Sequence, residues 1–169
     1  MGARSRARRG AGGRVGGFTA VELLIACVLL ALIATVLWPG VSRVRARWAV
    51  AGARDAVAAW HARARWTALA HGRLVQLRLH DDSGGGRVEL WRVGIDPLAP
   101  APVLDDALDL AVEFPGVRLE SNREVLCFGA RGLPVGGAGC DLPNATIVFR
   151  MGAVADTATV SLAGRWLKR

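Results

Sequence analysis

The side chains that could perform acid–base, metal or nucleophilic chemistry are few and widely spaced. His61, His71 and His80 are ten and nine residues apart, not the i, i+4 spacing that puts two metal ligands on one helical face. Two aspartate pairs, at 81–82 and 105–106, fall in glycine- or proline-rich sequence, where solvated turn aspartates are common. No Cys-x-x-Cys, Gly-x-Ser-x-Gly or phosphate-binding loop occurs. We therefore expect no catalytic residue, no metal site and no cofactor, and we do not expect an enzyme.

One carboxylate stands apart because it lies inside an apolar run. Residues 18–38 are almost wholly apolar around Glu22, and as a helix they span roughly 30 Å, the hydrocarbon thickness of a bilayer. A charged group at that depth costs about 2 to 3 kcal/mol or more unless it has a partner. The run predicts a membrane helix over residues 18–39. It is either a plain signal anchor with one tolerated acid or a helix whose Glu22 is paired.

The segment before this run is basic and rich in glycine. Residues 1–17 hold five arginines, six glycines and no acid, too little apolar surface to fold. A secretory signal has its small-residue cleavage site after the apolar core. Here Gly16-Gly17 stands before that core, so the apolar helix would survive processing.

Gly17, Phe18 and Glu22, together with the basic leader, resemble the class III leader of type IV prepilins and type II secretion pseudopilins. The resemblance implies that a prepilin peptidase cuts between Gly17 and Phe18 and methylates the new amino group of Phe18. In a filament, Glu22 of one subunit would pair with the Phe18 ammonium of its neighbour, and losing one partner of such a buried pair costs several kcal/mol. Pro39 stands where many pilins carry proline, and we expect either a kink there or a helix end.

The charge balance changes once the leader is set aside. The net charge of +8 falls to +3 without the five leader arginines, so the high pI is poor evidence for nucleic-acid binding. Arginines flank the apolar run on both sides, and charge alone does not decide the topology. The prepilin resemblance implies a cytoplasmic N-terminus, one pass through the inner membrane, and a periplasmic domain assembled into a periplasmic or surface filament.

Residues 40–169 are long enough for one small domain. Apolar residues three and four apart predict an amphipathic helix that ends near His71-Gly72, with a face of Val50, Ala53, Val57, Trp60 and Ala64. A loop is expected over 97–109, and strands are expected over 74–79, 88–93, 108–114, 125–128, 146–150 and 157–162. The predicted class is α+β and pilin-like. A long N-terminal helix, membrane-spanning in its first half and amphipathic in its second, would pack on antiparallel β-sheets.

Three later segments resemble the GspH/FimT branch of this family. Residues 64–75 resemble its passage from the helix to the first strand, and residues 126–134 its strand and loop with an Arg-Gly step. Residues 159–165 resemble its closing strand with a Gly-Arg ending. With the leader, the resemblance covers most of the chain.

The expected state of each cysteine depends on whether it lies in the membrane helix or in the periplasmic domain. Cys127 and Cys140 would lie in the oxidising periplasm and are a candidate disulfide, which would stabilise the domain by about 3 kcal/mol. The alternative is two separate buried thiols. Cys27, within the apolar helix, is expected to act as a small apolar residue.

The C-terminus is a candidate DNA-binding site. Arg165, Lys168 and Arg169 could contact phosphates while an exposed Trp166 stacks on a base. Some FimT-like minor pilins use a Gly-Arg-x-Arg tail in this way, but Leu167 stands here in place of the second arginine. The alternative is a solvated basic end to the final strand.

Two functions of different class follow. The first is a minor pseudopilin or pilin that assembles with other pilin or pseudopilin subunits in a type II secretion pseudopilus or a type IV pilus. The second is a FimT-like minor pilin that captures DNA during natural transformation. A plain membrane-anchored domain is a third. The sequence does not choose between the secretion pseudopilus and the type IV pilus.

Overall fold

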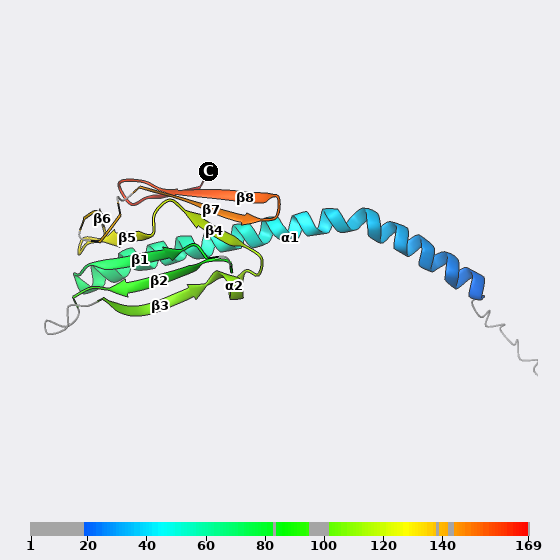
Figure 1. Cartoon of the computed structure of the whole chain (residues 1–169), viewed down its shortest axis with the longest axis horizontal. Coiled ribbons are helices and arrows are strands. Elements are labelled where there is room, and N and C mark those ends of the chain that lie inside the picture. Colours follow the sequence, from blue (N-terminus) through cyan, green and yellow to red (C-terminus); the bar gives the residue numbers. More distant parts are fainter. Residues whose placement is uncertain (1–18, 83, 95–101, 138, 142–143, 169) are drawn as a thin grey trace, which may run out of the picture. The chain divides into compact units, whose positions relative to one another are not determined.

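The structure, a computed structural model, describes residues 19–82, 84–94, 102–137, 139–141 and 144–168. The chain divides into two compact units, Met1–Gly40 and Val41–Arg169. One helix, α1 (Ala20–His71), begins in the first unit and ends in the second, where two antiparallel sheets follow it (Figure 1). The predicted α+β class, with a long N-terminal helix packed on antiparallel sheets, is confirmed.

Helix α1 has a defined start and stop. The hydroxyl of Thr19 accepts a hydrogen bond from the backbone N–H of Glu22 (3.2 Å), as an N-cap residue does. At the other end Gly72 has a φ of +61°, and the N–H of Arg73 donates to the carbonyl of Ala68 (3.2 Å). The helix continues through Pro39, so the alternative of a helix end there is wrong. A proline removes only one intrahelical hydrogen bond, and long helical runs on both sides can offset that loss.

The first sheet has the strand order β3-β2-β1-β5-β6, and all its neighbours are antiparallel. Its strands are β1 (Val75–His80), β2 (Arg87–Arg92), β3 (Val103–Asp109), β5 (Val125–Phe128) and β6 (Pro134–Val135). The second sheet has the order β4-β7-β8-β9, again antiparallel. Its strands are β4 (Arg118–Ser121), β7 (Ala145–Met151), β8 (Val154–Val160) and β9 (Trp166–Lys168). Strands β4, β6 and β9, which have four, two and three residues, were not predicted. Such short segments show little or no alternating pattern.

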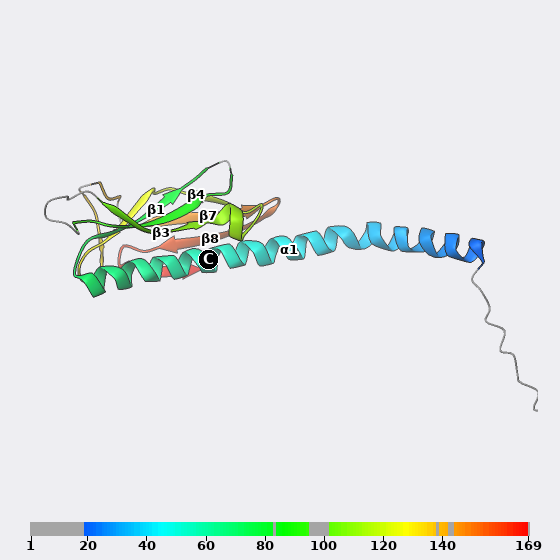
Figure 2. The same cartoon turned by 90° about the horizontal axis from the view of Figure 1, so that it is seen from below.

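The core of the second unit lies between α1 and the two sheets. Figure 2 shows both sheets on one side of the C-terminal part of the helix. The helix contributes a buried stripe with spacings of three and four: Ala46, Val50, Ala53, Val57, His61, Ala64 and Ala68. The sheets add the largest fully buried side chains, among them Phe128, Phe149, Leu77 and Ile147. Trp60, expected on this face, is half-buried at its edge, and His61 takes the central position.

The segment from 103 to 114 differs from the sequence prediction. Residues 103–109, expected as part of a loop, form β3, and Leu110–Glu113, expected as strand, form the one-turn helix α2. The side chain of Asp109 accepts hydrogen bonds from the backbone N–H groups of Ala111 (2.9 Å) and Val112 (3.3 Å). This cap ends the strand and starts the turn of helix. The rest of the predicted loop, residues 97–101, lies outside the described residues.

The acidic pair in β3 is not a pair of solvated turn aspartates. Asp105 lies 2.6 Å from the guanidinium of Arg92 on β2, and Asp106 lies 2.6 Å from that of Arg63 on α1. These ion pairs give the acid-rich edge strand cationic neighbours. The three aspartates among the seven residues of β3 favoured a loop in the sequence, and the pairing with Arg92 and Arg63 depends on residues far away along the chain.

Arg65 joins the helix to both sheets. Its Nε donates to the carbonyl of Gly132 (3.0 Å), in the β5–β6 connection, and its Nη1 donates to the carbonyl of Gly164 (3.1 Å), in the β8–β9 connection. Both glycines have positive φ, +66° and +70°. A Cβ on Gly132 would lie 2.8 Å from Leu69, and one on Gly164 would lie 2.9 Å from Pro134. The two connections therefore need glycine in order to reach the arginine.

We expect Arg65→Met to destabilise the second unit by about 2 to 4 kcal/mol, since two part-buried carbonyls lose their donors. Arg65→Lys should lose less, because one ammonium replaces one of the two bonds. Urea unfolding of the full chain in non-ionic detergent, followed by circular dichroism, measures both. The matched control is Arg118→Met, at an exposed arginine on β4. Equal midpoints for Arg65→Met and Arg118→Met would contradict the prediction.

Candidate functional site

The helix of the first unit exposes its apolar side chains. Every side chain from Thr19 to Thr35 is exposed, and so are Leu37 and Trp38. The large members are Val21, Leu23, Leu24, Ile25, Val28, Leu29, Leu30, Leu32 and Ile33. A continuous apolar surface of this kind marks contact with another protein or with lipid.

Glu22 is the only charged residue between Arg14 and Arg43. It is exposed and follows Thr19 with the spacing of a capping box. The candidate cleavage residues Gly17 and Phe18, and with them the candidate partner of Glu22, lie outside the described residues. The structure thus places Glu22 in the first turn of an exposed apolar helix, and its pairing stays a prediction.

By length and composition, none of the described helices qualifies alone as a membrane span. Two consecutive parts of α1, Ala20–Thr35 and Gly40–His71, qualify only when they are taken together.

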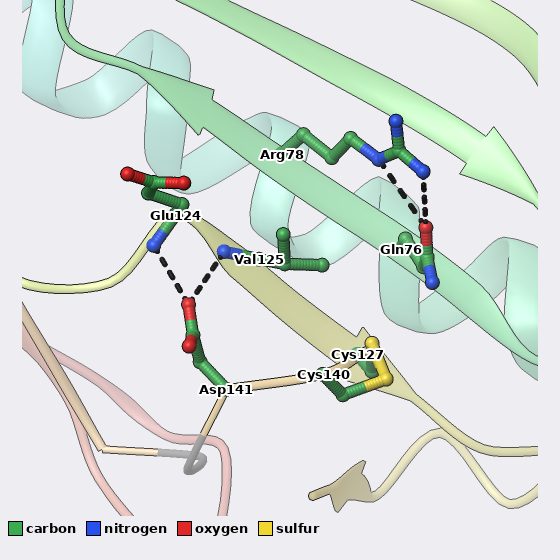
Figure 3. The surroundings of a disulfide bond; sticks show 7 residues. All are labelled: Gln76, Arg78, Glu124, Val125, Cys127, Cys140 and Asp141. Carbon is green, nitrogen blue, oxygen red and sulfur yellow. Dashed lines mark hydrogen bonds between the residues drawn. A yellow bond between two sulfur atoms is a disulfide. The ribbon is translucent and has the colours of Figure 1, made fainter. Parts of the chain in front are cut away.

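The candidate cysteines are joined. Cys127 on β5 forms a disulfide with Cys140, and their Cα atoms lie 5.7 Å apart. Figure 3 shows Asp141 beside this bond, with its carboxylate directed at the start of β5. That carboxylate accepts hydrogen bonds from the backbone N–H groups of Glu124 and Val125, both at 2.8 Å. The segment around Cys140 is therefore attached to β5 at two places, at the start of the strand and at Cys127.

The C-terminal residues form β9 rather than a free tail. Trp166, Leu167 and Lys168 pair with β8, opposite Val160, Thr159 and Ala158. Trp166 is half-buried and packs against the core, so the expectation of an exposed stacking tryptophan is wrong. Strand pairing turns the indole inward because alternate residues of β9 face the helix.

The candidate DNA-binding cations are not gathered on one free surface. Lys168 Nζ lies 3.0 Å from the carboxylate of Asp55 on α1. The pKa of Asp55 is lowered, chiefly by the hydrogen bond from Lys168; burial opposes this shift, and Arg54 adds to it. Arg165 is exposed, and Arg169 lies outside the described residues. One of the three cations is thus engaged in holding β9 to the helix.

His61 lies on the buried stripe of α1, a position that was not predicted for it from the sequence. Its ring packs edge-on against Phe128 (5.2 Å between centroids) and tilted against Trp166 (5.5 Å). Neither His61 Nε2 nor Trp166 Nε1 has a hydrogen-bond partner among the described residues. Burial, and then the nearby charge of Arg65, lower the pKa of His61 to about 4. The spacing of four from Val57 and three to Ala64 could have placed it on the buried stripe.

No group of three or more histidine, cysteine, aspartate or glutamate side chains in the described part of the chain is arranged to hold a metal ion. An acidic hollow of about 570 Å³ lies at the β1–β2 turn, and its lining includes His80, Asp81, Asp82 and Glu89. Glu89 is already in contact with His80 and Arg87, each at 3.3 Å. These contacts leave α1 and the strands packed on it as the candidate functional elements.

The fold that these elements define is of the pilin class. No protein-family model and no curated protein sequence matches the chain. Among solved structures, the chain is similar to the type IV minor pilin FimU of Pseudomonas aeruginosa in space group P21, with a TM-score of 0.55 and 17% identity over 73% of this chain and 90% of that chain. A second crystal form of FimU, in P65, gives a TM-score of 0.51 and 16% identity over 70% and 90% of the two chains. These likenesses show a pilin-like fold.

We expect the stability of the domain to fall as pH drops from about 6.5 towards 4. The unfolded state protonates His61 first, near pH 6.5. The contribution of neutral His61 to the free energy of unfolding is therefore complete above that pH. It is lost by about pH 4, a change of about 3 kcal/mol. His61→Leu should remove this part of the pH dependence, whereas His80→Gln, at an exposed histidine, should retain it. Urea titrations between pH 4 and 7 measure the difference. Parallel pH profiles for wild type and His61→Leu would refute the assignment.

Replacing both bonded cysteines, Cys127→Ala with Cys140→Ala, should lower the free energy of unfolding by about 3 kcal/mol, because the closed loop no longer restricts the unfolded chain. Urea unfolding under oxidising conditions measures the loss. Under reducing conditions the wild type should shift towards the double variant, and Cys27→Ala should behave as wild type in both. A double variant as stable as the oxidised wild type would contradict this expectation.

Proposed function

We propose that the chain is a minor pilin or pseudopilin, a structural subunit that assembles into a filament through the exposed apolar part of α1. The observation that carries the proposal is the run of exposed apolar side chains with Glu22 as its one charge, attached to a pilin-like domain. The solved neighbour FimU is itself a type IV minor pilin, which supports a subunit of the same general kind.

The proposal includes a processing step. Residues 1–17 are a leader that a prepilin peptidase removes after Gly17, and the new N-terminus, Phe18, is methylated. Residues 18–39 then form the membrane and assembly helix, and residues 40–169 form the periplasmic domain. The chain lies in the inner membrane before assembly, with its N-terminus in the cytoplasm, and its partners are other pilin or pseudopilin subunits.

Membership of the GspH/FimT branch is part of the proposal. The three segments that resemble this branch contain Arg65, Gly132 and Gly164, and these residues meet through the two hydrogen bonds of Arg65. This contact supports the proposed branch, since each of the three resembling segments supplies one part of it. Both type II secretion pseudopili and type IV pili remain open as the host filament.

Assembly is favoured over DNA capture. The Gly-Arg step at 164–165 has a structural use, because the glycine carbonyl accepts from Arg65. Lys168 is paired with Asp55, and Trp166 is half-buried. These contacts account for Gly164, Trp166 and Lys168 without a nucleic acid, and we do not propose DNA binding for this chain.

Glu22→Ala should leave leader removal intact and should strongly reduce incorporation into filaments, because the neighbour's ammonium would be buried without a partner, at a cost of about 3 to 5 kcal/mol. Sheared filament fractions measure incorporation, and the intact mass of the protein reports cleavage. Gly17→Leu provides the uncleaved reference.

Thr19→Ala is the matched control, since it removes the helix cap but keeps the carboxylate. If Glu22 acts by ion pairing, Thr19→Ala assembles and Glu22→Ala does not. Equal defects in the two variants would show that Glu22 only helps to start the helix. Normal filaments from Glu22→Ala would overturn the assembly mechanism.

A further inference from the structure

Three arginines surround α1 at the start of the second unit, and we call Arg43, Arg45 and Arg47 the arginine collar. All three are exposed, and Ala46, only 8% exposed, is the first residue of the buried stripe. No described carboxylate lies within ion-pair distance of the collar. The sequence has no acid between Glu22 and Asp55. Within the described part of the chain, the collar is therefore a charge of +3 without an acidic partner.

The position of the collar along the chain suits a membrane surface. The proposed membrane helix, residues 18–39, is about 33 Å long, close to the thickness of the hydrocarbon core. The collar begins four residues after its end, about 6 Å further along the helix. From Arg43 to Arg47 the helix rises about 6 Å, which matches a headgroup layer of roughly 5 to 7 Å.

The arrangement around the helix distinguishes lipid from a protein partner. Arg43 and Arg47 are four residues apart and share one face, whereas Arg45 lies about 200° around the helix from Arg43. Cations on opposite sides fit a helix that passes through a layer of phosphates. A protein docked on one side would meet only part of the collar.

The neighbouring side chains are those of a membrane interface. Trp48 is 77% exposed, and Val41 and Val44 are 63% and 52% exposed. Tryptophan is enriched at the boundary between hydrocarbon and water. Arginines just beyond a span on the exported side oppose the usual charge bias of insertion, so their presence calls for a local anionic partner.

We propose that the arginine collar binds the phosphates of anionic phospholipids, such as phosphatidylglycerol, at the outer surface of the membrane that α1 crosses. The inference rests on the proposed function, because it requires α1 to be a membrane helix. It adds a lipid class and three residues that contact it. The collar would hold the subunit at a fixed depth before assembly.

The test uses the full chain in vesicles that contain equal amounts of phosphatidylglycerol and phosphatidylcholine. After mild detergent extraction, native mass spectrometry counts the lipids of each kind that stay bound. The wild type should retain phosphatidylglycerol preferentially. In the triple variant Arg43→Gln, Arg45→Gln, Arg47→Gln, the ratio of bound phosphatidylglycerol to bound phosphatidylcholine should fall by up to about fivefold for each arginine. The triple lysine variant should keep it.

The matched control is Arg118→Gln, Arg131→Gln, Arg150→Gln, which removes the same charge from exposed positions in the domain and should leave the preference unchanged. A chain that inserts but shows the same lipid preference with and without the collar overturns this inference alone. If the triple glutamine variant of the collar also fails to bind a partner subunit, the collar binds an acidic protein surface instead of lipid. A wild-type chain that does not insert into the vesicles overturns the proposed membrane helix as well.

Discussion

The contact on which the domain depends is the one between Arg65 and two glycine carbonyls. A single guanidinium on α1 holds the β5–β6 connection of one sheet and the β8–β9 connection of the other. The planar fork of arginine suits this task because its donors point in fixed, different directions. Removing it would leave two part-buried acceptors without donors and would release both sheets from the same turn of helix. Lys168 and Asp55 add a second, more exposed link between β9 and α1.

The two parts of α1 solve different physical problems. In the second unit one stripe of small side chains is buried, and small residues let the sheets approach the helix closely. In the first unit the described side chains are exposed and almost all apolar. Among the described residues of that unit, the contact of Glu22 is with Thr19, and it uses the backbone of Glu22 and not its carboxylate. The carboxylate of Glu22 is thus left for a partner on another subunit, as the proposed pairing requires.

The motifs that suggested a DNA-binding tail have a use inside the fold. Gly164 has a backbone conformation that other residues rarely adopt, and its carbonyl faces Arg65. Trp166 fills the space beside His61 instead of facing solvent. Here the Gly-Arg step near the C-terminus lies in the connection that brings the last strand, β9, onto β8. In a flexible tail the same two residues would have suggested phosphate contacts.

The sequence alone predicted the long helix, its stop at His71-Gly72, the α+β class and the strands at 74–79, 88–93 and 125–128. These features depend on local periodicity and on glycine, which act over a few residues. The tertiary structure alone decided that His61 and not Trp60 completes the buried stripe, that acid-rich residues 103–109 pair as β3, and that the last residues form β9. Each of these depends on partners that are distant in sequence, such as Arg63 for Asp106 and Asp55 for Lys168. Local patterns do not contain that information, because burial and charge pairing are fixed only when the helix and both sheets meet.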